Sequence, residues 1–62
     1  MTPREAEQLI EKDGWVLVSI EGSHHHYKHP RKPGKVTIPF HTRPKDLSRK
    51  TLSSILKQAG LK

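Results

Sequence analysis

Near the middle of the chain runs Gly22-Ser23-His24-His25-His26-Tyr27-Lys28-His29-Pro30, a stretch that holds four of the five histidines. Gly22-Ser23 is typical of a tight turn, and residues 24–29 form a segment of strand length between that turn and a proline. Because histidine gains and loses a proton near neutral pH, this stretch is the part of the chain best equipped for acid–base chemistry. We therefore expect a turn followed by a strand that carries the candidate site.

Two further strands are predicted around this one. Residues 15–21, rich in β-branched and aromatic side chains, predict a strand antiparallel to 24–29, although their alternation does not indicate which face is buried. Trp15 is expected in the core, because the chain has only three aromatic residues to fill it. A basic loop with two prolines and a glycine leads to the third strand, residues 35–40. On the central strand, alternation places His24, His26 and Lys28 on one face and His25, Tyr27 and His29 on the other.

Both ends of the chain predict a helix with one narrow apolar stripe. Thr2-Pro3-Arg4-Glu5 has the pattern of a capping box, and Asp13-Gly14 is typical of a helix end. Ser48 is the expected cap of a second helix, which ends at Gly60. The stripes comprise Ala6, Leu9 and Ile10 in the first helix and Leu52, Ile55, Leu56 and Ala59 in the second. We expect an α+β fold in the order α-β-β-β-α, with a three-stranded antiparallel sheet, both helices on one face and the opposite face open to a ligand.

The composition predicts one small basic domain, residues 1–62. Twelve Lys and Arg against six Asp and Glu give a formal net charge of +6, which favours nucleic acid or an acidic partner. Residues 4–21 hold four Glu and one Asp, whereas residues 28–62 hold ten Lys or Arg and only Asp46. Cysteine is absent and no apolar run has the length of a membrane span, so we expect a cytoplasmic protein without a membrane segment.

Several motifs, in this order and at compatible spacing, resemble the HicA toxins of bacterial toxin–antitoxin systems. They are Gly14-Trp15, Gly22-Ser23-His24-His25 with Tyr27 and His29-Pro30, Val36-Thr37-Ile38-Pro39 with His41, and residues 51–61. The resemblance spans nearly the whole chain. It implies a fold like that of double-stranded-RNA-binding domains, messenger-RNA interferase activity, and inhibition by a HicB antitoxin encoded beside the toxin. It also implies that the histidine after Gly-Ser, His24 here, is the essential residue.

RNA cleavage without a metal needs a base for the 2′-hydroxyl proton and positive charge at the phosphate. We assign the base to His24 and expect support from Ser23, His26 and Lys28. The acid for the leaving oxygen stays unassigned between His26 and water. No cofactor is expected. The RNA-binding surface is expected to comprise Arg31, Lys32, Lys35, Arg43, Lys45, Arg49 and Lys50.

Two alternatives stand beside this interpretation. His24 and His26 on one strand face have the spacing of zinc ligands, but no Cys and no acidic residue between Gly22 and Lys45 completes such a site, so no metal is expected. The second alternative is a noncatalytic RNA- or DNA-binding module of the same fold. His25, His29 and His41 are interpreted as structural or surface residues.

Overall fold

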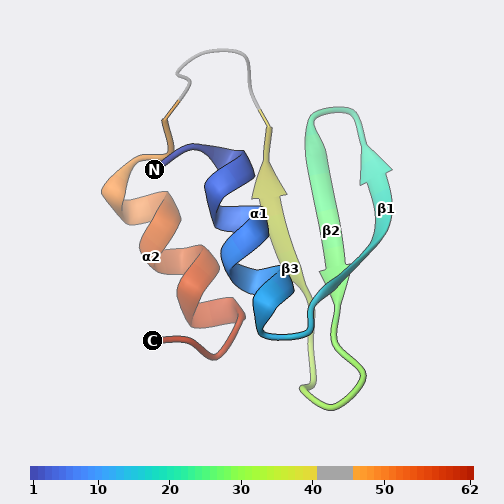
Figure 1. Ribbon diagram of the computed structural model, residues 1–62. Helices are drawn as coiled ribbons and strands as arrows, with labels where there is room; N and C mark the ends of the chain where they lie inside the picture. Colours follow the sequence, from blue (N-terminus) through green and yellow to red (C-terminus); the bar gives the residue numbers. More distant parts are fainter. Residues whose placement is uncertain (41–45) are drawn as a thin grey trace.

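The computed structural model describes residues 1–40 and 46–62. Its elements follow the expected α-β-β-β-α order, and Figure 1 shows the helices on one side of the picture and β1 at the far edge of the sheet. The elements are α1 (Pro3–Lys12), β1 (Val16–Glu21), β2 (His24–Lys28), β3 (Val36–Pro39) and α2 (Arg49–Gln58). The predictions that fall on His41, Arg43 and Lys45 lie outside the described residues.

Both helices begin at the caps that the sequence predicts. The Glu5 N–H donates to Thr2 Oγ1 (3.2 Å) and the Thr2 N–H donates to Glu5 Oε1 (2.8 Å), which is a complete capping box. At α2, the Thr51 N–H donates to Ser48 Oγ (3.1 Å). Gly14 follows α1 with a φ of +107°, a left-handed conformation that favours glycine. These local signals fix where each helix lies along the chain.

The three strands form an antiparallel sheet in the order β1-β2-β3. Gly22-Ser23 is a two-residue hairpin loop that pairs Glu21 with His24, and Gly22 has a φ of +59°. The pairing slips between Leu17 and Ser19, so Val18 is an extra residue on β1. Paired residues point to the same side of a sheet, so this register assigns every side chain of β2 to one of two faces.

One face of the sheet packs against the helices, and it holds the core. The buried hydrophobic side chains are Ala6 and Ile10 of α1, Trp15, Tyr27 of β2, Val36 and Ile38 of β3, Ile55 of α2, and Ala59 at the C-cap of α2. Phe40, Leu47 and Leu52 are partly buried against this cluster. In the register, Tyr27 pairs with Val36 and His25 with Ile38, so this helix-covered side is the face of His25 and Tyr27. The opposite side, which we call the open face, carries His24, His26 and Lys28.

Strand β1 differs from the expectation in two ways. It begins at Val16 rather than Trp15, because the Trp15 N–H donates to the Ile10 carbonyl (3.1 Å) and belongs to the turn after α1. Trp15 itself is in the core as predicted, with 2% of its surface exposed. All six residues of β1 are exposed, so neither of its faces is buried. The side chains of β1 therefore extend beyond the cover that the helices provide.

Three segments meet around His29, which lies just after β2. Its Nε2 donates to the Asp13 carbonyl (2.7 Å), and its Nδ1 accepts the N–H groups of Arg31 and Lys32 (both 3.0 Å). The ring also lies edge-on to Trp15, with 5.2 Å between centroids. This arrangement joins the end of α1 to the β2–β3 loop, and it gives His29 the structural role that was expected of it.

Lys32 strengthens the same junction. Its ammonium donates to the Asp13 carboxylate and to the Ala59 carbonyl (3.1 Å for the latter), so it ties the end of α1 to the end of α2. The hydrogen bond from Lys32 holds the pKa of Asp13 below its ordinary value of 3.8. A carboxyl whose pKa is lower in the folded than in the unfolded state stabilises the fold above the unfolded pKa, and this stabilisation disappears as the pH falls through the folded pKa.

We therefore expect Asp13→Asn to flatten the acid dependence of stability. The urea concentration at the unfolding midpoint is measured by far-UV circular dichroism at several pH values. As the pH is lowered from about 5 to about 2, this midpoint should decrease more steeply for the wild-type protein than for the variant. The Glu5 carboxylate, whose pKa is also lowered, is present in both proteins, so the difference isolates Asp13. Parallel curves for the two proteins would contradict this account of the junction.

Candidate active site

The open face combines histidines from β2 with polar side chains from both neighbouring strands. The register places Glu21 beside His24, and it places Ser19 and Thr37 on either side of His26. These side chains stand on the side of the sheet that contributes none of the described core residues. A charged or polar ligand can therefore approach them without disturbing the packing.

His24 is the first residue of β2, directly after the Gly22-Ser23 turn. Its side chain is exposed, and Ser23 beside it is half-buried. The Phe40 N–H donates to the Ser23 carbonyl (2.6 Å), which ties the turn to the end of β3. The backbone that carries His24 is thus fixed on both sides, while its imidazole faces solvent on the open face. This is the turn-to-strand position that the sequence predicts for His24, and its role as a base stays a prediction.

His26 is held at both ring nitrogens. Its Nδ1 lies 3.0 Å from Thr37 Oγ1, and its Nε2 lies 2.7 Å from Glu21 Oε1, although the angle of the second contact is not that of a hydrogen bond. The His26 side chain is 12% exposed, whereas that of Glu21 is 77% exposed. Thr37 and Glu21 thus lie beside the two ring nitrogens of His26 on the open face. The acid for the leaving oxygen stays unassigned between His26 and water.

Lys28 shares the open face with the two histidines, and its side chain is exposed. It follows His24 by four residues, which corresponds to about 13 Å along a strand. A single phosphate next to His24 is therefore distant from the Lys28 backbone, and the lysine is better placed for a neighbouring phosphate of the same strand of nucleic acid.

Side chains on the helix-covered face are engaged inside the fold. The buried Tyr27 hydroxyl donates to Glu7 Oε2 (2.5 Å), and burial, more than this hydrogen bond, raises the pKa of Tyr27. The His25 ring stacks on Phe40 with 3.8 Å between centroids, and its Nδ1 lies 3.8 Å from Glu7 Oε2. Neither residue reaches the open face, so neither can serve His24 in proton transfer.

The predicted cationic surface is divided among different parts of the molecule. Arg31 and Lys35 are exposed on the β2–β3 loop, which lies at the opposite end of β2 from His24 (Figure 1). Arg49 and Lys50 are exposed at the start of α2. Lys32 is the exception among the described members, because its ammonium is bound within the fold. The structure thus places His24, His26 and Lys28 on one face, whereas the described members of the predicted cationic surface lie on the β2–β3 loop and at the start of α2 rather than beside His24.

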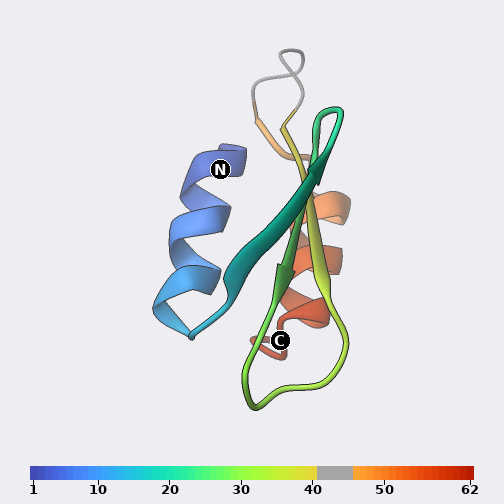
Figure 2. The same ribbon diagram turned by 90° about the vertical axis from the view of Figure 1, so that its right-hand side faces the viewer.

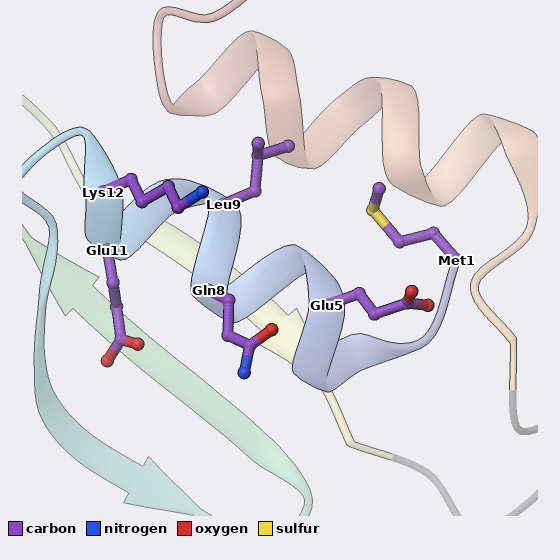
Figure 3. A pocket seen from close by; sticks show the side chains of 6 residues that line it. All are labelled: Met1, Glu5, Gln8, Leu9, Glu11 and Lys12. Carbon is purple, nitrogen blue, oxygen red and sulfur yellow. The ribbon is translucent and has the colours of Figure 1, made fainter.

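The described residues contain no group of three or more His, Cys, Asp or Glu side chains that could hold a metal ion. No helix among residues 1–40 and 46–62 is long and apolar enough to cross a membrane. An open hollow does exist along α1, away from the open face (Figure 3). It is lined by Met1, Glu5, Gln8, Leu9, Glu11 and Lys12.

Sequence reasoning missed Glu21 and Thr37 as members of the site. Each lies on a neighbouring strand, and only the register brings it to His26. For Glu21 a signal was present, because a two-residue hairpin loop necessarily pairs the residue before Gly22 with His24. For Thr37 the sequence offered none, since the length of the β2–β3 loop does not fix a register.

Comparisons with known proteins bear on the family and the fold of the chain. A family model described as "HicA toxin of bacterial toxin-antitoxin" matches residues 3–61. Among solved structures, a chain of a toxin–antitoxin complex from Streptococcus pneumoniae is similar, with 31% sequence identity and a TM-score of 0.81. The match covers 98% of this chain and 98% of that chain. A search of curated proteins gives no match.

Proposed function

Because the chain belongs to the HicA toxin family of bacterial toxin–antitoxin systems, we propose that it is a metal-independent endoribonuclease that cleaves messenger RNA in the cytoplasm. We further propose that a HicB antitoxin inhibits it. The observation that supports the activity best is the exposed position of His24 at the start of β2, on a sheet face that also carries His26 and Lys28.

In the proposed reaction, His24 acts as general base. It takes the proton from a ribose 2′-hydroxyl, and the resulting oxygen attacks the adjacent phosphorus. The bond from phosphorus to the 5′-oxygen breaks, and this oxygen takes a proton from water. The hydroxide that remains takes the proton back from His24. The products are a 2′,3′-cyclic phosphate and a 5′-hydroxyl end, and no redox change occurs. DNA lacks the 2′-hydroxyl, so the same chemistry excludes DNA as a substrate.

The neighbours of His24 have distinct proposed roles. Ser23 is close enough in sequence to orient His24 or to hold a phosphate oxygen, and Lys28 is proposed to bind a flanking phosphate. His26, fixed by Glu21 and Thr37, is proposed to shape the floor of the site rather than to transfer a proton. The cations proposed to attract the RNA backbone are Arg31, Lys35, Arg43, Lys45, Arg49 and Lys50, whereas Lys32 is engaged by Asp13 and Ala59.

The direct test is to incubate the purified protein with a labelled RNA or with the matching DNA, each with and without a chelator. We expect cleavage of the RNA only, with 2′,3′-cyclic phosphate ends visible by mass spectrometry. RNA that is bound but never cut would instead identify a noncatalytic RNA-binding module, and cleavage that stops on adding the chelator would contradict the metal-independent mechanism.

A further inference from the structure

The outer edge of β1 carries several exposed apolar side chains that the proposed reaction does not use. Val16, Val18 and Ile20 are 57%, 55% and 55% exposed, and Leu17 is exposed as well. In the register, Leu17 pairs with the buried Tyr27, and Ile20 pairs with His25, so both point to the helix-covered side. They nevertheless stay exposed. Seen from the β1 side, no described element lies in front of this strand (Figure 2).

The edge of the sheet at β3 is protected against pairing with another strand, whereas the edge at β1 lacks such protection. At β3, the Thr37 N–H donates to the Gln58 side chain of α2 (3.0 Å), and the strand ends at Pro39, which has no N–H to offer. Natural proteins protect exposed sheet edges in such ways because an open edge pairs with other strands. Among residues 16–20 of β1 there is no Lys, Arg, Asp, Glu or Pro.

We propose that the outer edge of β1 is the docking strand for the antitoxin, which adds one of its own β-strands there and covers Leu17 and Ile20. This inference rests on the proposed pairing with an antitoxin. In this mode of recognition, backbone hydrogen bonds provide affinity, and pockets for alternate side chains provide specificity. The chemistry of β1 requires a partner strand with apolar side chains on the side that meets Leu17 and Ile20.

The charges around β1 favour a different protein over a second copy of this chain. Residues 4–21 carry four Glu and one Asp against Arg4 and Lys12, and β1 itself ends in Glu21. Glu7 contacts the Tyr27 hydroxyl, and Tyr27 pairs with Leu17, so the Glu7 carboxylate lies on the helix-covered side of the sheet near the apolar strand. Two copies joined through β1 would bring these acidic regions together. A partner strand flanked by Lys or Arg complements them, and RNA does not.

The position of β1 also explains how a partner docked there reaches His24. Glu21 of β1 pairs directly with His24, and neighbouring strands lie about 4.8 Å apart. A strand added to β1 would therefore lie about 10 Å from the His24 strand. Edge pairing alone buries little area, so the antitoxin must extend its contact surface. The adjoining open face is the surface into which it can extend, and this would exclude RNA.

The test uses the double variant Val18→Lys/Ile20→Lys, which places charge on the exposed edge without altering a buried side chain. Its matched control is Leu9→Lys/Leu61→Lys, which makes the same change at two exposed leucines elsewhere. Affinity for the HicB protein encoded by the neighbouring gene is measured by isothermal titration calorimetry. We expect the edge variant to bind about tenfold more weakly or worse, and the control to bind as the wild-type protein does.

RNA cleavage by each free toxin is measured in parallel, with and without one equivalent of antitoxin. The inference predicts that the edge variant cuts RNA normally and escapes inhibition. If the wild-type protein cuts no RNA but binds the antitoxin through β1, the docking inference holds and the proposed activity fails. The inference is overturned if the edge variant binds as tightly as the wild-type protein, if the antitoxin does not bind at all, or if the edge instead joins two copies of the toxin in light scattering.

Discussion

Replacing His24 with alanine is expected to lower the rate of RNA cleavage about 100- to 10,000-fold, the usual contribution of a positioned general base. The side chain is exposed and lies on the sheet face that contributes no described core residue. The change should therefore leave the folded structure intact. Cleavage of a fluorogenic RNA by the purified variant and growth arrest on its expression both measure the effect.

His25→Ala is the matched control for this result. It removes the neighbouring imidazole of the same stretch, but one that stacks on Phe40 on the helix-covered face. We expect it to lower thermal stability modestly and to keep most of the cleavage rate per folded molecule. Equal activity of the wild-type protein and His24→Ala, at matched folded fractions, would show that the base lies elsewhere.

Trp15→Ala should have the largest effect on stability. Truncation of a buried Trp typically costs about 3–5 kcal/mol. The whole free energy of unfolding expected for 62 residues is roughly 3–9 kcal/mol. Trp15 is 2% exposed, and its indole N–H donates to the Ala59 carbonyl (3.3 Å), so the ring connects the turn after α1 with the end of α2. We expect the variant to be largely unfolded at 37 °C.

The loss of stability in Trp15→Ala is measured by urea unfolding with far-UV circular dichroism as the signal. Fluorescence is unsuitable, because the variant lacks the single tryptophan of the chain. Trp15→Phe keeps an aromatic ring but loses the hydrogen bond to Ala59, and we expect it to lose about 1–3 kcal/mol. A Trp15→Ala protein as stable as Trp15→Phe would mean that the ring volume matters less than the burial of Trp15 implies.

Much of the fold was predictable because its signals are local. The capping box at Thr2, the cap at Ser48 and the Gly22-Ser23 turn each depend on a few adjacent residues, and the structure has all three. The exposure of both faces of β1 was not predictable. It depends on where the helices lie across the sheet, and the strand's own alternation is equally apolar on either side.

The candidate site was predictable in part for the same reason. Alternation along β2 was enough to place His24, His26 and Lys28 on one face, and the structure agrees. The contacts that fix His26 come from Glu21 and Thr37, on other strands, and depend on register. Lys32 was predicted from its charge alone, whereas its binding to Asp13 depends on how the loop meets the end of α1.

The core and the candidate site lie on opposite faces of the sheet, so a mutation can affect one without the other. The described core residues of β2 and β3 lie on the helix-covered face, and His24 lies on the other. Under the proposed mechanism, a single codon change at position 24 would abolish RNA cleavage and leave the fold intact. With β1 unaltered, the silenced copy would remain a decoy that occupies antitoxin. In a cell carrying both copies, it would therefore release the intact toxin rather than counteract it.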